Sequence, residues 1–254
     1  MRALASLRQT AFCYNCRMQF LDLTLATPAE NLALDEALLD EADLGPGPRE
    51  TLRLWEPTQT MVVIGRSSQV AQEVNASRCR QESVPILRRA SGGAAIVTGP
   101  GCLMYAVILS YELRPHLRML DQAHRFVLER IKAAVEPFCG TVQLCGTSDL
   151  ALAGRKVSGN SLRCKRDHFL YHGTLLLNFP LNRVEELLSL PPRQPEYRKG
   201  RSHAEFLANL DVRSGPLRSA LVAAWQAEVT RTDWPRAALR ALVAQRYASD
   251  DWNL

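Results

Sequence analysis

The sequence of 254 residues predicts an α+β fold, in which helices flank a mixed β-sheet. The main observation is the order of the predicted elements: one helix, several short strands, a long helix, more strands and finally helices. This order differs from the regular strand–helix alternation that builds a parallel α/β sheet. Hydrophobic residues make up 46% of the chain and charged residues 22%, which is typical of soluble globular proteins and excludes disordered and fibrous classes.

The first predicted element is a helix over residues 28–42. Thr27 and Glu30 form a capping box around Pro28 at the first helical position, and leucines follow at helical spacing. Glycines and prolines at 45–48 end this helix. Short runs rich in apolar and β-branched residues come next, each bounded by Gly, Pro or Ser. They predict strands at 52–55, 61–64, 86–89, 95–97 and 103–108.

A second helix is predicted over 116–138, because apolar residues such as Leu120, Val127 and Ile131 recur every three or four positions. Strand patterns then resume, and we expect all strands of the chain to belong to one sheet. The later strands are predicted at 142–144, 150–153, 156–162 and 169–179, and helices at 182–190, 216–230 and 235–247.

Residues 1–17 contain three arginines and no acid before Met18, where the ordered pattern begins. A start codon assigned too early explains this better than an organelle transit peptide. We therefore expect one domain over 18–254. Cys13 and Cys16 have metal-like spacing, but no second pair matches them, so no zinc site is expected. Seven cysteines, mostly in apolar segments, indicate free thiols in a reducing, cytoplasmic setting.

Charge and hydropathy limit the partners of the chain. Lys and Arg number 31 against 26 Asp and Glu, and the net charge of +5 is spread along the sequence. No nucleic-acid partner is expected, while an anionic ligand or an acidic protein partner stays open beside an ordinary solvated surface. The longest apolar run, Cys102 to Leu109, is much shorter than the ~20 residues of a membrane-spanning helix, so no membrane association is expected.

Three polar stretches are candidates for chemistry. Arg88 and Arg89 lead into a Ser-Gly-Gly turn at 91–93, where guanidinium donors and open backbone N–H groups converge as a phosphate or carboxylate requires. A plain hairpin is the alternative. Lys156 lies between small residues in a strand, which places it at a ligand or in an ordinary basic hairpin. His172 stands at the polar entry to a buried strand, as a site residue or a structural one.

In this order, the three stretches resemble the catalytic domain of the lipoate-protein ligase A family, within the wider biotin and lipoate ligase (BPL/LPL) fold. The resemblance covers nearly all of residues 19–254 and implies a mixed sheet flanked by helices. It is carried by Pro28-Ala29-Glu30-Asn31-Leu32-Ala33-Leu34-Asp35-Glu36, Leu54-Trp55-Glu56-Pro57, Val62-Val63-Ile64-Gly65-Arg66, Glu73-Val74-Asn75, Arg88-Arg89-Ala90-Ser91-Gly92-Gly93, Arg155-Lys156-Val157-Ser158-Gly159, His172-Gly173-Thr174-Leu175 and Asp251-Trp252-Asn253.

The resemblance implies that ATP and Mg2+ activate lipoate or octanoate to an acyl-adenylate. The acyl group then passes to a lysine of a lipoyl acceptor domain, in 2-oxoacid dehydrogenase E2 subunits or the glycine cleavage H protein. Lys156 is the implied catalytic residue, because its charge would stabilise both the attack on the α-phosphate and the departure of AMP. Asp149 is the implied Mg2+ ligand. The implied acyl- and adenylate-binding residues are Trp55, Arg89, Ser91, Gly92, Gly93, Ala94, Asp149, Ser158, Gly159, His172 and Thr174, with Val63 and Met104 beside Trp55 in the acyl slot.

The chain departs from the family pattern in the turn and after it. Ala94 stands where the family has a third glycine, and Thr98 and Cys102 replace the His and Asn that follow. The methyl group of Ala94 narrows the loop, and the loss of the His removes a polar contact. Gly65-Arg66-Ser67 lacks the Gly-Arg-Gly-Arg run of biotin ligases, so biotin is not the expected substrate.

Two alternative functions stay open. Some relatives of this length are octanoyltransferases, which take octanoate from acyl carrier protein onto a cysteine thiolate without ATP. Cys145 is then the candidate nucleophile, ahead of Cys102 and Cys164. The other alternative is a non-catalytic acyl-binding or scaffold subunit. The resemblance covers only the catalytic domain of full-length ligases, so we expect no C-terminal accessory domain in this chain; some relatives supply that domain as a separate subunit. The basic element Arg198-Lys199-Gly200-Arg201 is expected to steer docking of an acidic acceptor domain.

Overall fold

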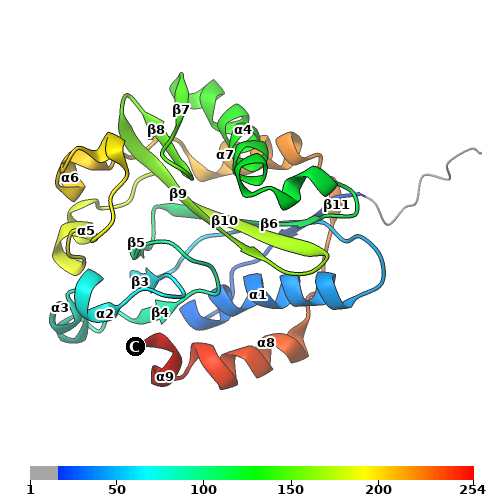
Figure 1. Cartoon of the computed structure of the whole chain (residues 1–254), viewed down its shortest axis with the longest axis horizontal. Coiled ribbons are helices and arrows are strands. Elements are labelled where there is room, and N and C mark those ends of the chain that lie inside the picture. The colour runs from blue at the N-terminus through cyan, green and yellow to red at the C-terminus, as the bar shows by residue number, and fades with distance from the viewer. Residues whose placement is uncertain (1–16) are drawn as a thin grey trace, which may run out of the picture.

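The computed structural model describes residues 17–254, so the expected early start codon and the Cys13/Cys16 pair lie outside the described residues. Over those residues a large sheet has the strand order β11-β1-β2-β6-β10-β9-β8-β7 (Figure 1). β1 runs parallel to both of its neighbours, and the other neighbouring pairs are antiparallel. The strands are β1 (Gln19–Asp22), β2 (Thr51–Trp55), β6 (Cys102–Ser110), β7 (Val142–Cys145), β8 (Asp149–Leu152), β9 (Arg155–Cys164), β10 (His168–Leu176) and β11 (Val229–Thr230).

Three of the predicted strands form a separate small sheet. β3 (Met61–Ile64) lies between the parallel β4 (Ile86–Arg88) and the antiparallel β5 (Ile96–Thr98). The prediction of a single sheet is therefore wrong for these strands. All four residues of β3 are buried, and a strand buried on both faces has the same sequence pattern in a small sheet as in the middle of a large one.

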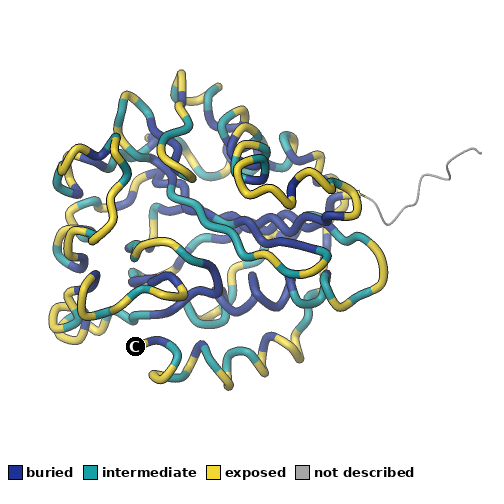
Figure 2. Tube along the Cα trace, in the orientation of Figure 1, coloured by how far each residue is buried: buried dark blue, intermediate teal, exposed yellow. Residues whose placement is uncertain are grey.

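Helices and the small sheet cover the two faces of the large sheet (Figure 1). One face packs against α1 (Pro28–Leu44), the small sheet and α8 (Arg236–Leu242). The other face packs against α4 (Leu120–Cys139) and α7 (Ser214–Trp225). Successive side chains of β6 enter opposite cores, because neighbouring residues of a strand point to opposite faces. Figure 2 shows that the large sheet and α1 make up most of the buried interior.

Short elements connect these layers. Across residues 17–254, no helix is both long enough and apolar enough to span a bilayer. The connecting elements are α2 (Val70–Glu73), α3 (Ala76–Gln81), the 3-10 turn η2 (Pro115–Arg118), α5 (Asn182–Leu187), the 3-10 turn η3 (Glu196–Arg198), α6 (His203–Phe206), the π-helical turn η4 (Val243–Tyr247) and α9 (Asp250–Asn253).

The predicted element boundaries agree with the structure at some ends and fail at others. The capping box at Thr27 begins α1, and β3 has the predicted limits. The predicted helix 116–138 is wrong at its start, because Met119 is extended and separates η2 from α4. The predicted helix 216–230 is wrong at its end. Gln226 adopts a left-handed conformation after Trp225, and the chain then pairs with β1 as β11.

A buried ion pair joins α1 to β2. Arg53 is fully buried, and its Nη1 donates to Asp35 Oδ1 at 2.6 Å. The other guanidinium donors reach Asn31 and the carbonyl oxygen of Leu23. Because every donor group of Arg53 meets an acceptor, the desolvated charge is compensated within the fold.

We predict that Arg53→Met destabilises the protein by about 3–5 kcal/mol, because the Asp35 carboxylate then stays buried without its partner. Urea denaturation, followed by circular dichroism, measures this loss of unfolding free energy. The double substitution Arg53→Met with Asp35→Leu is the control and should recover part of the loss, since it removes both charges. A single variant as stable as the wild type would contradict the prediction.

Candidate active site

The turn between β4 and β5 is held from behind by Arg89. Its guanidinium donates to the carbonyl oxygens of Val63 at 3.2 Å, Gly92 at 2.5 Å and Ala94 at 3.1 Å. Burial lowers the pKa of Arg89 to about 10, which leaves the group charged at neutral pH. The side chain therefore acts as a clamp on the backbone of the turn.

The clamp leaves one side of the turn's backbone open. Over residues 17–254, the N–H groups of Gly92, Gly93 and Ala94 donate to no protein acceptor, and Gly93 and Ala94 border a cavity. Successive open N–H groups make a concave site for anionic oxygens. Three successive carbonyl groups, by contrast, each accept a hydrogen bond: Ser91 from the Arg66 N–H at 2.8 Å, Gly92 from Arg89, and Gly93 from the Ser68 hydroxyl at 3.2 Å.

Two glycines make this close backbone packing possible. A β-carbon on Gly65 would lie 1.9 Å from the Gly93 carbonyl oxygen, which no side chain can tolerate. Gly93 itself has φ of +92°, a conformation that favours glycine. The turn thus has its shape only because both positions lack a side chain.

Arg88 connects the C-terminal segment to the same turn. Its side chain donates to the carbonyl oxygens of Gly65 at 3.0 Å and Ser68 at 2.8 Å, and also to that of Trp252 at 2.6 Å. The Trp252 indole N–H donates back to the Arg88 carbonyl at 2.9 Å. We expected the guanidinium groups of Arg88 and Arg89 to face the ligand. Their hydrogen bonds instead go to protein carbonyl groups, so the backbone N–H groups are left for the ligand.

Lys156 and Asp149 face each other across β8 and β9. Lys156 Nζ lies 2.8 Å from Asp149 Oδ1, and the Tyr197 hydroxyl donates to Asp149 Oδ2 at 2.8 Å. A β-carbon on Gly159 would lie 2.8 Å from Lys156 Nζ, so the ammonium group rests directly over this glycine. The lysine is thereby fixed in direction, with its side chain 24% exposed.

A chain of hydrogen bonds runs from α1 to the turn through His172. Asp35 Oδ2 lies 3.2 Å from His172 Nδ1, and His172 Nε2 lies 2.6 Å from Ser91 Oγ. A carboxylate only accepts, so Nδ1 carries a proton, and in the neutral imidazole Nε2 accepts from the Ser91 hydroxyl. Ser91 Oγ then accepts from Arg89 Nε at 3.2 Å. This chain orients the first residue of the turn.

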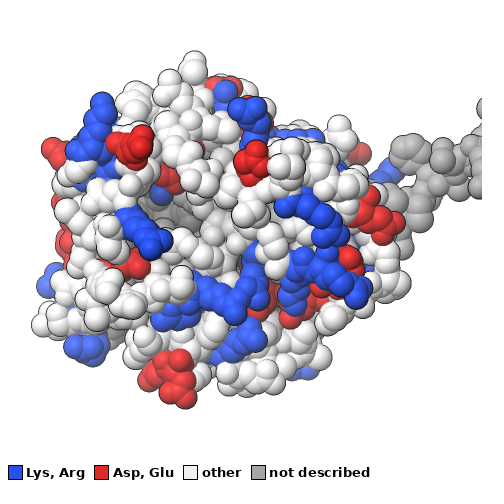
Figure 3. Space-filling model, viewed as in Figure 1, with Lys and Arg blue, Asp and Glu red and all other residues white. Residues whose placement is uncertain are grey.

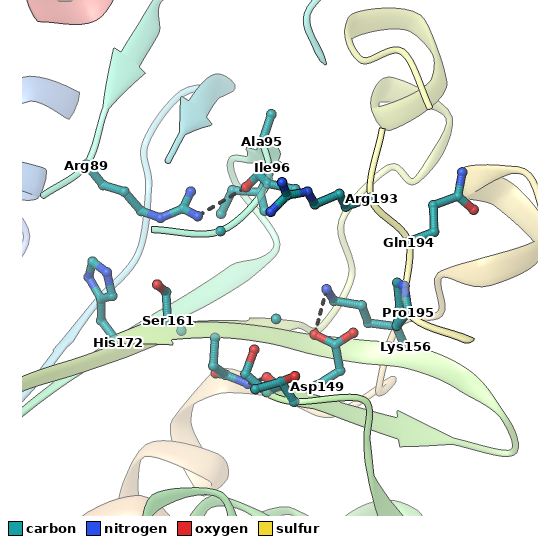
Figure 4. Close-up of a pocket in the computed structure, with 17 residues that line it drawn as sticks. Arg89, Ala95, Ile96, Asp149, Lys156, Ser161, His172, Arg193, Gln194 and Pro195 are labelled. Atoms are coloured by element: carbon teal, nitrogen blue, oxygen red, sulfur yellow. Dashed lines mark hydrogen bonds and ion pairs between the residues drawn. The ribbon is translucent and has the colours of Figure 1, made fainter. Parts of the chain in front are cut away.

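The turn, Lys156 and His172 surround one polar cavity of about 370 Å³ (Figure 4). Arg89 and Arg193 approach it from one side, and Lys156, Asp149, Ser161 and His172 line the strands opposite. A narrower slot of about 130 Å³ opens beside it and shares Lys156, Gly159 and Ala94 with it. Ala95, Ile96, Asp149, Arg193 and Pro195 also border both spaces. The remainder of the slot is mostly apolar: Val97, Leu176, Val184, Leu188, Phe206 and Leu207, with Thr174, Pro191, Arg198 and His203.

Some residues predicted for the site lie elsewhere. Trp55 borders neither cavity and is buried beside Arg53, whose guanidinium lies 5.2 Å from the ring centroid. Ser91 and Ser158 are buried behind the cavity wall. Arg89, Gly93, Ala94, Asp149, Lys156, Gly159 and His172 line the polar cavity, and Thr174 lines the slot, with its hydroxyl near the Met104 sulfur at 3.3 Å.

Asp149 does not fit a resident magnesium ion. Both of its oxygens already bind protein groups, Lys156 and Tyr197. In the part of the chain that the structure describes, no three His, Cys, Asp or Glu side chains cluster to hold a metal. The contacts of Asp149 in this structure are with the lysine and the tyrosine, and its role as a magnesium ligand stays a prediction.

The described cysteines and the basic element are not placed as expected. Cys145 borders neither cavity, and burial, together with the Asp149 carboxylate, raises the pKa of its thiol. Cys102 is buried and its pKa is raised to about 11, while Cys164 is exposed at the end of β9. Arg198 is only 3% exposed, so this member of the basic element is not available for docking.

Sequence reasoning missed several residues of the site. Asn160, Ser161, Arg193 and Gln194 line the polar cavity, and Tyr197 holds Asp149. Asn160 and Ser161 follow Lys156 in the same strand. Strand alternation places Asn160 on the face of Lys156 but gives no signal for Ser161. The others come from the 191–198 segment, which no local pattern connects to the lysine.

We predict that Gly65→Ala destabilises the protein by about 1–3 kcal/mol, because the added methyl group displaces the Gly93 carbonyl. Amide hydrogen exchange of Arg66, whose N–H donates to the Ser91 carbonyl of the turn, should become faster than in the wild type. Gly215→Ala, at a helical position where a β-carbon meets nothing within 4 Å, is the matched control and should leave that exchange unchanged. Equal exchange in both variants would refute the role of Gly65.

Comparisons with known proteins agree with this geometry. Two relatives assigned by name to lipoate-protein ligase A, in Mycoplasma pneumoniae and Aeropyrum pernix, are 29% and 31% identical over 163 and 169 residues. These matches cover 64% and 66% of this chain but only 46% and 61% of the relatives' length. The octanoyltransferase LipM of Brevibacillus brevis is 25% identical over 264 residues, covering 90% of this chain and 95% of LipM.

Solved structures show the same fold. A bipartite lipoate protein ligase of Thermoplasma acidophilum, studied with its E2 lipoyl domain, superimposes with a TM-score of 0.79 at 22% identity, covering 93% of this chain and 95% of the other. A lipoate-protein ligase A bound with ATP gives 0.77 at 22% identity, covering 93% and 97%. A family model described as the lipoyl protein ligase A/B catalytic domain matches residues 27–220, and the chain therefore belongs to this family.

Proposed function

We propose that the protein activates lipoate or octanoate with ATP and attaches the acyl group to a lysine of a lipoyl acceptor domain. The observation that carries the proposal is the position of Lys156 where the polar cavity meets the apolar slot. The slot suits an alkyl chain, and the open N–H groups of the turn suit phosphate or carboxylate oxygens. The Lys156 ammonium group lies between the two spaces, where it can neutralise negative charge on both the reacting carboxylate and the phosphate.

In the first step, a carboxylate oxygen of the acid attacks the α-phosphorus of ATP, and pyrophosphate leaves. Such phosphoryl chemistry depends on positioning and charge neutralisation. Lys156 would neutralise charge on both reacting groups, while the N–H groups of Gly93 and Ala94 bind oxygens of the nucleotide or the acid. ATP would bring Mg2+ with it as part of the substrate complex, since Mg2+ is commonly held through substrate phosphates.

In the second step, the amine of the acceptor lysine attacks the acyl carbonyl carbon. An amide forms, AMP leaves, and the amine gives up a proton. Lys156 would again stabilise the departing phosphate. The acceptor must reach the cavity from solvent, and Figure 3 shows a hollow on this face of the molecule with basic side chains around it. That charge suits an acidic partner surface, such as the lipoyl domain of a 2-oxoacid dehydrogenase E2 subunit or the glycine cleavage H protein.

The relatives support this assignment. Several bear the name of lipoate-protein ligase, and one solved relative was studied with an E2 lipoyl domain. Another solved relative holds ATP. The cysteines of the described residues are free, and together with a need for ATP this leads us to place the reaction in the cytoplasm.

We predict that Lys156→Met lowers the rate of acyl-adenylate formation by at least about 100-fold, because it removes a preorganised charge at the reacting centre. Pyrophosphate release with octanoate, ATP and magnesium measures this rate. Lys199→Met, at an exposed lysine outside both cavities, is the matched control and should keep the wild-type rate. Undiminished adenylate formation by Lys156→Met would exclude the proposed role.

The octanoyltransferase alternative is favoured by the nearly full-length match to LipM. It needs a thiolate at the cavity, and the position and raised pKa of Cys145 oppose that role. We expect Cys145→Ser to retain at least about half of the wild-type activity, since Ser fills a similar volume. Intact mass of a lipoyl domain, incubated with octanoyl acyl carrier protein or with octanoate and ATP, separates the two reactions. Transfer from the carrier protein that disappears in Cys145→Ser would favour the transferase, and no transfer by either route would favour a scaffold or a missing accessory subunit.

A further inference from the structure

The wall of the apolar slot contains a buried cation that has no counter-ion. Arg198 is 3% exposed and follows Tyr197 in η3. Its Nε donates to the carbonyl oxygen of Arg201 at 2.9 Å. Over residues 17–254, Nη2 is buried and meets no hydrogen-bond acceptor, and no carboxylate forms an ion pair with the group. In Arg53, Arg88 and Arg89, by contrast, no buried guanidinium nitrogen lacks an acceptor within the described residues.

The surroundings of Arg198 do not compensate its charge. The guanidinium lies 4.7 Å from the centroid of the Phe206 ring, and Arg201 adds a second positive charge nearby. A cation over an aromatic ring is stabilised, but this does not satisfy the N–H donors in the ring plane of the guanidinium. Buried polar groups are otherwise hydrogen-bonded almost without exception, so an unsatisfied one indicates a missing partner.

The position of Arg198 indicates what that partner is. Arg198 and His203 line the slot but not the polar cavity, so they lie in the part away from the turn. His203 donates its Nε2 proton to the Ser189 carbonyl at 3.3 Å, and burial lowers its pKa, so it is neutral. His203 Nδ1 is then a hydrogen-bond acceptor. The neutral ring adds no second positive charge beside Arg198. An acyl chain whose carboxylate lies near Lys156 would bring its distal end into this part.

We propose that Arg198 is a specificity-determining residue that selects acyl chains carrying a hydrogen-bond acceptor near their distal end. The inference rests on the proposed function, because it concerns the acid bound in the same slot. A disulfide ring such as that of lipoate supplies sulfur lone pairs, and sulfur also packs well against an aromatic ring such as Phe206. The methyl end of octanoate supplies no acceptor and leaves the guanidinium unsatisfied.

The test compares three acids: lipoate, octanoate and 8-hydroxyoctanoate, which differs from octanoate by one acceptor oxygen. Pyrophosphate release gives kcat/KM for each acid with the wild type, Arg198→Met and the neighbouring control Lys199→Met. We expect the wild type and the control to favour both acceptor-bearing acids over octanoate by about tenfold or more. Arg198→Met keeps an unbranched side chain against Phe206, and its preference should fall to about onefold.

Two results would overturn the proposal. One is an equal kcat/KM of the wild type for octanoate and 8-hydroxyoctanoate. This measurement needs no variant. The other is an unchanged preference in Arg198→Met whose melting temperature matches that of the wild type. Calorimetric binding of the three acids without ATP distinguishes this failure from failure of the proposed function. If no acid is adenylated but the wild type binds 8-hydroxyoctanoate more tightly than octanoate, the slot assignment stands and the reaction is a different one.

Discussion

The clamp of Arg89 on the turn between β4 and β5 is the interaction on which the rest of the site depends. The N–H and C=O groups of one peptide unit point in opposite directions, because the unit is planar and trans. When Arg89, Arg66 and Ser68 bind three successive carbonyl groups, the N–H groups on the other side of those peptides are left without partners. The row of open N–H groups is therefore a consequence of how the carbonyl groups are satisfied.

This clamp is itself supported from both ends of the chain. α1 supplies Asp35, which orients His172 and through it Ser91. α9 supplies Trp252, which is bound by Arg88 directly before the turn. Groups in such networks stabilise the structure mainly by leaving no buried donor unsatisfied, so loss of one member exposes the others to the full desolvation cost. The tip of the turn is exposed, and its base is held by hydrogen bonds.

The sequence allowed the fold class, the capping box at Thr27 and the strand that carries Lys156 to be predicted, because each is written in local spacing. It did not allow the direction of long side chains to be predicted. The Arg88-Arg89 pair predicts guanidinium groups that face a ligand, but Arg88 donates to carbonyl groups of distant segments, and Arg89 donates to Val63 and to the backbone of its own turn. The family resemblance implies that Trp55 lines the acyl slot, but Trp55 lies in the core. Contacts with other segments of the chain set the direction of these side chains, and the spacing of residues in the sequence does not predict such contacts.

For the same reason, the sequence did not predict the connection between the slot and Lys156. Tyr197 donates to Asp149, which pairs with Lys156, and the next residue along η3 is Arg198 in the slot wall. A ligand that draws Arg198 toward the slot therefore acts on the backbone that carries Tyr197. Because Asp149 is shared between Tyr197 and Lys156, any shift of the tyrosine changes how tightly the ammonium group is held. In the roles proposed for Arg198 and Lys156, recognition of the chain end and placement of the charge at the reacting end depend on two adjacent residues of one short turn.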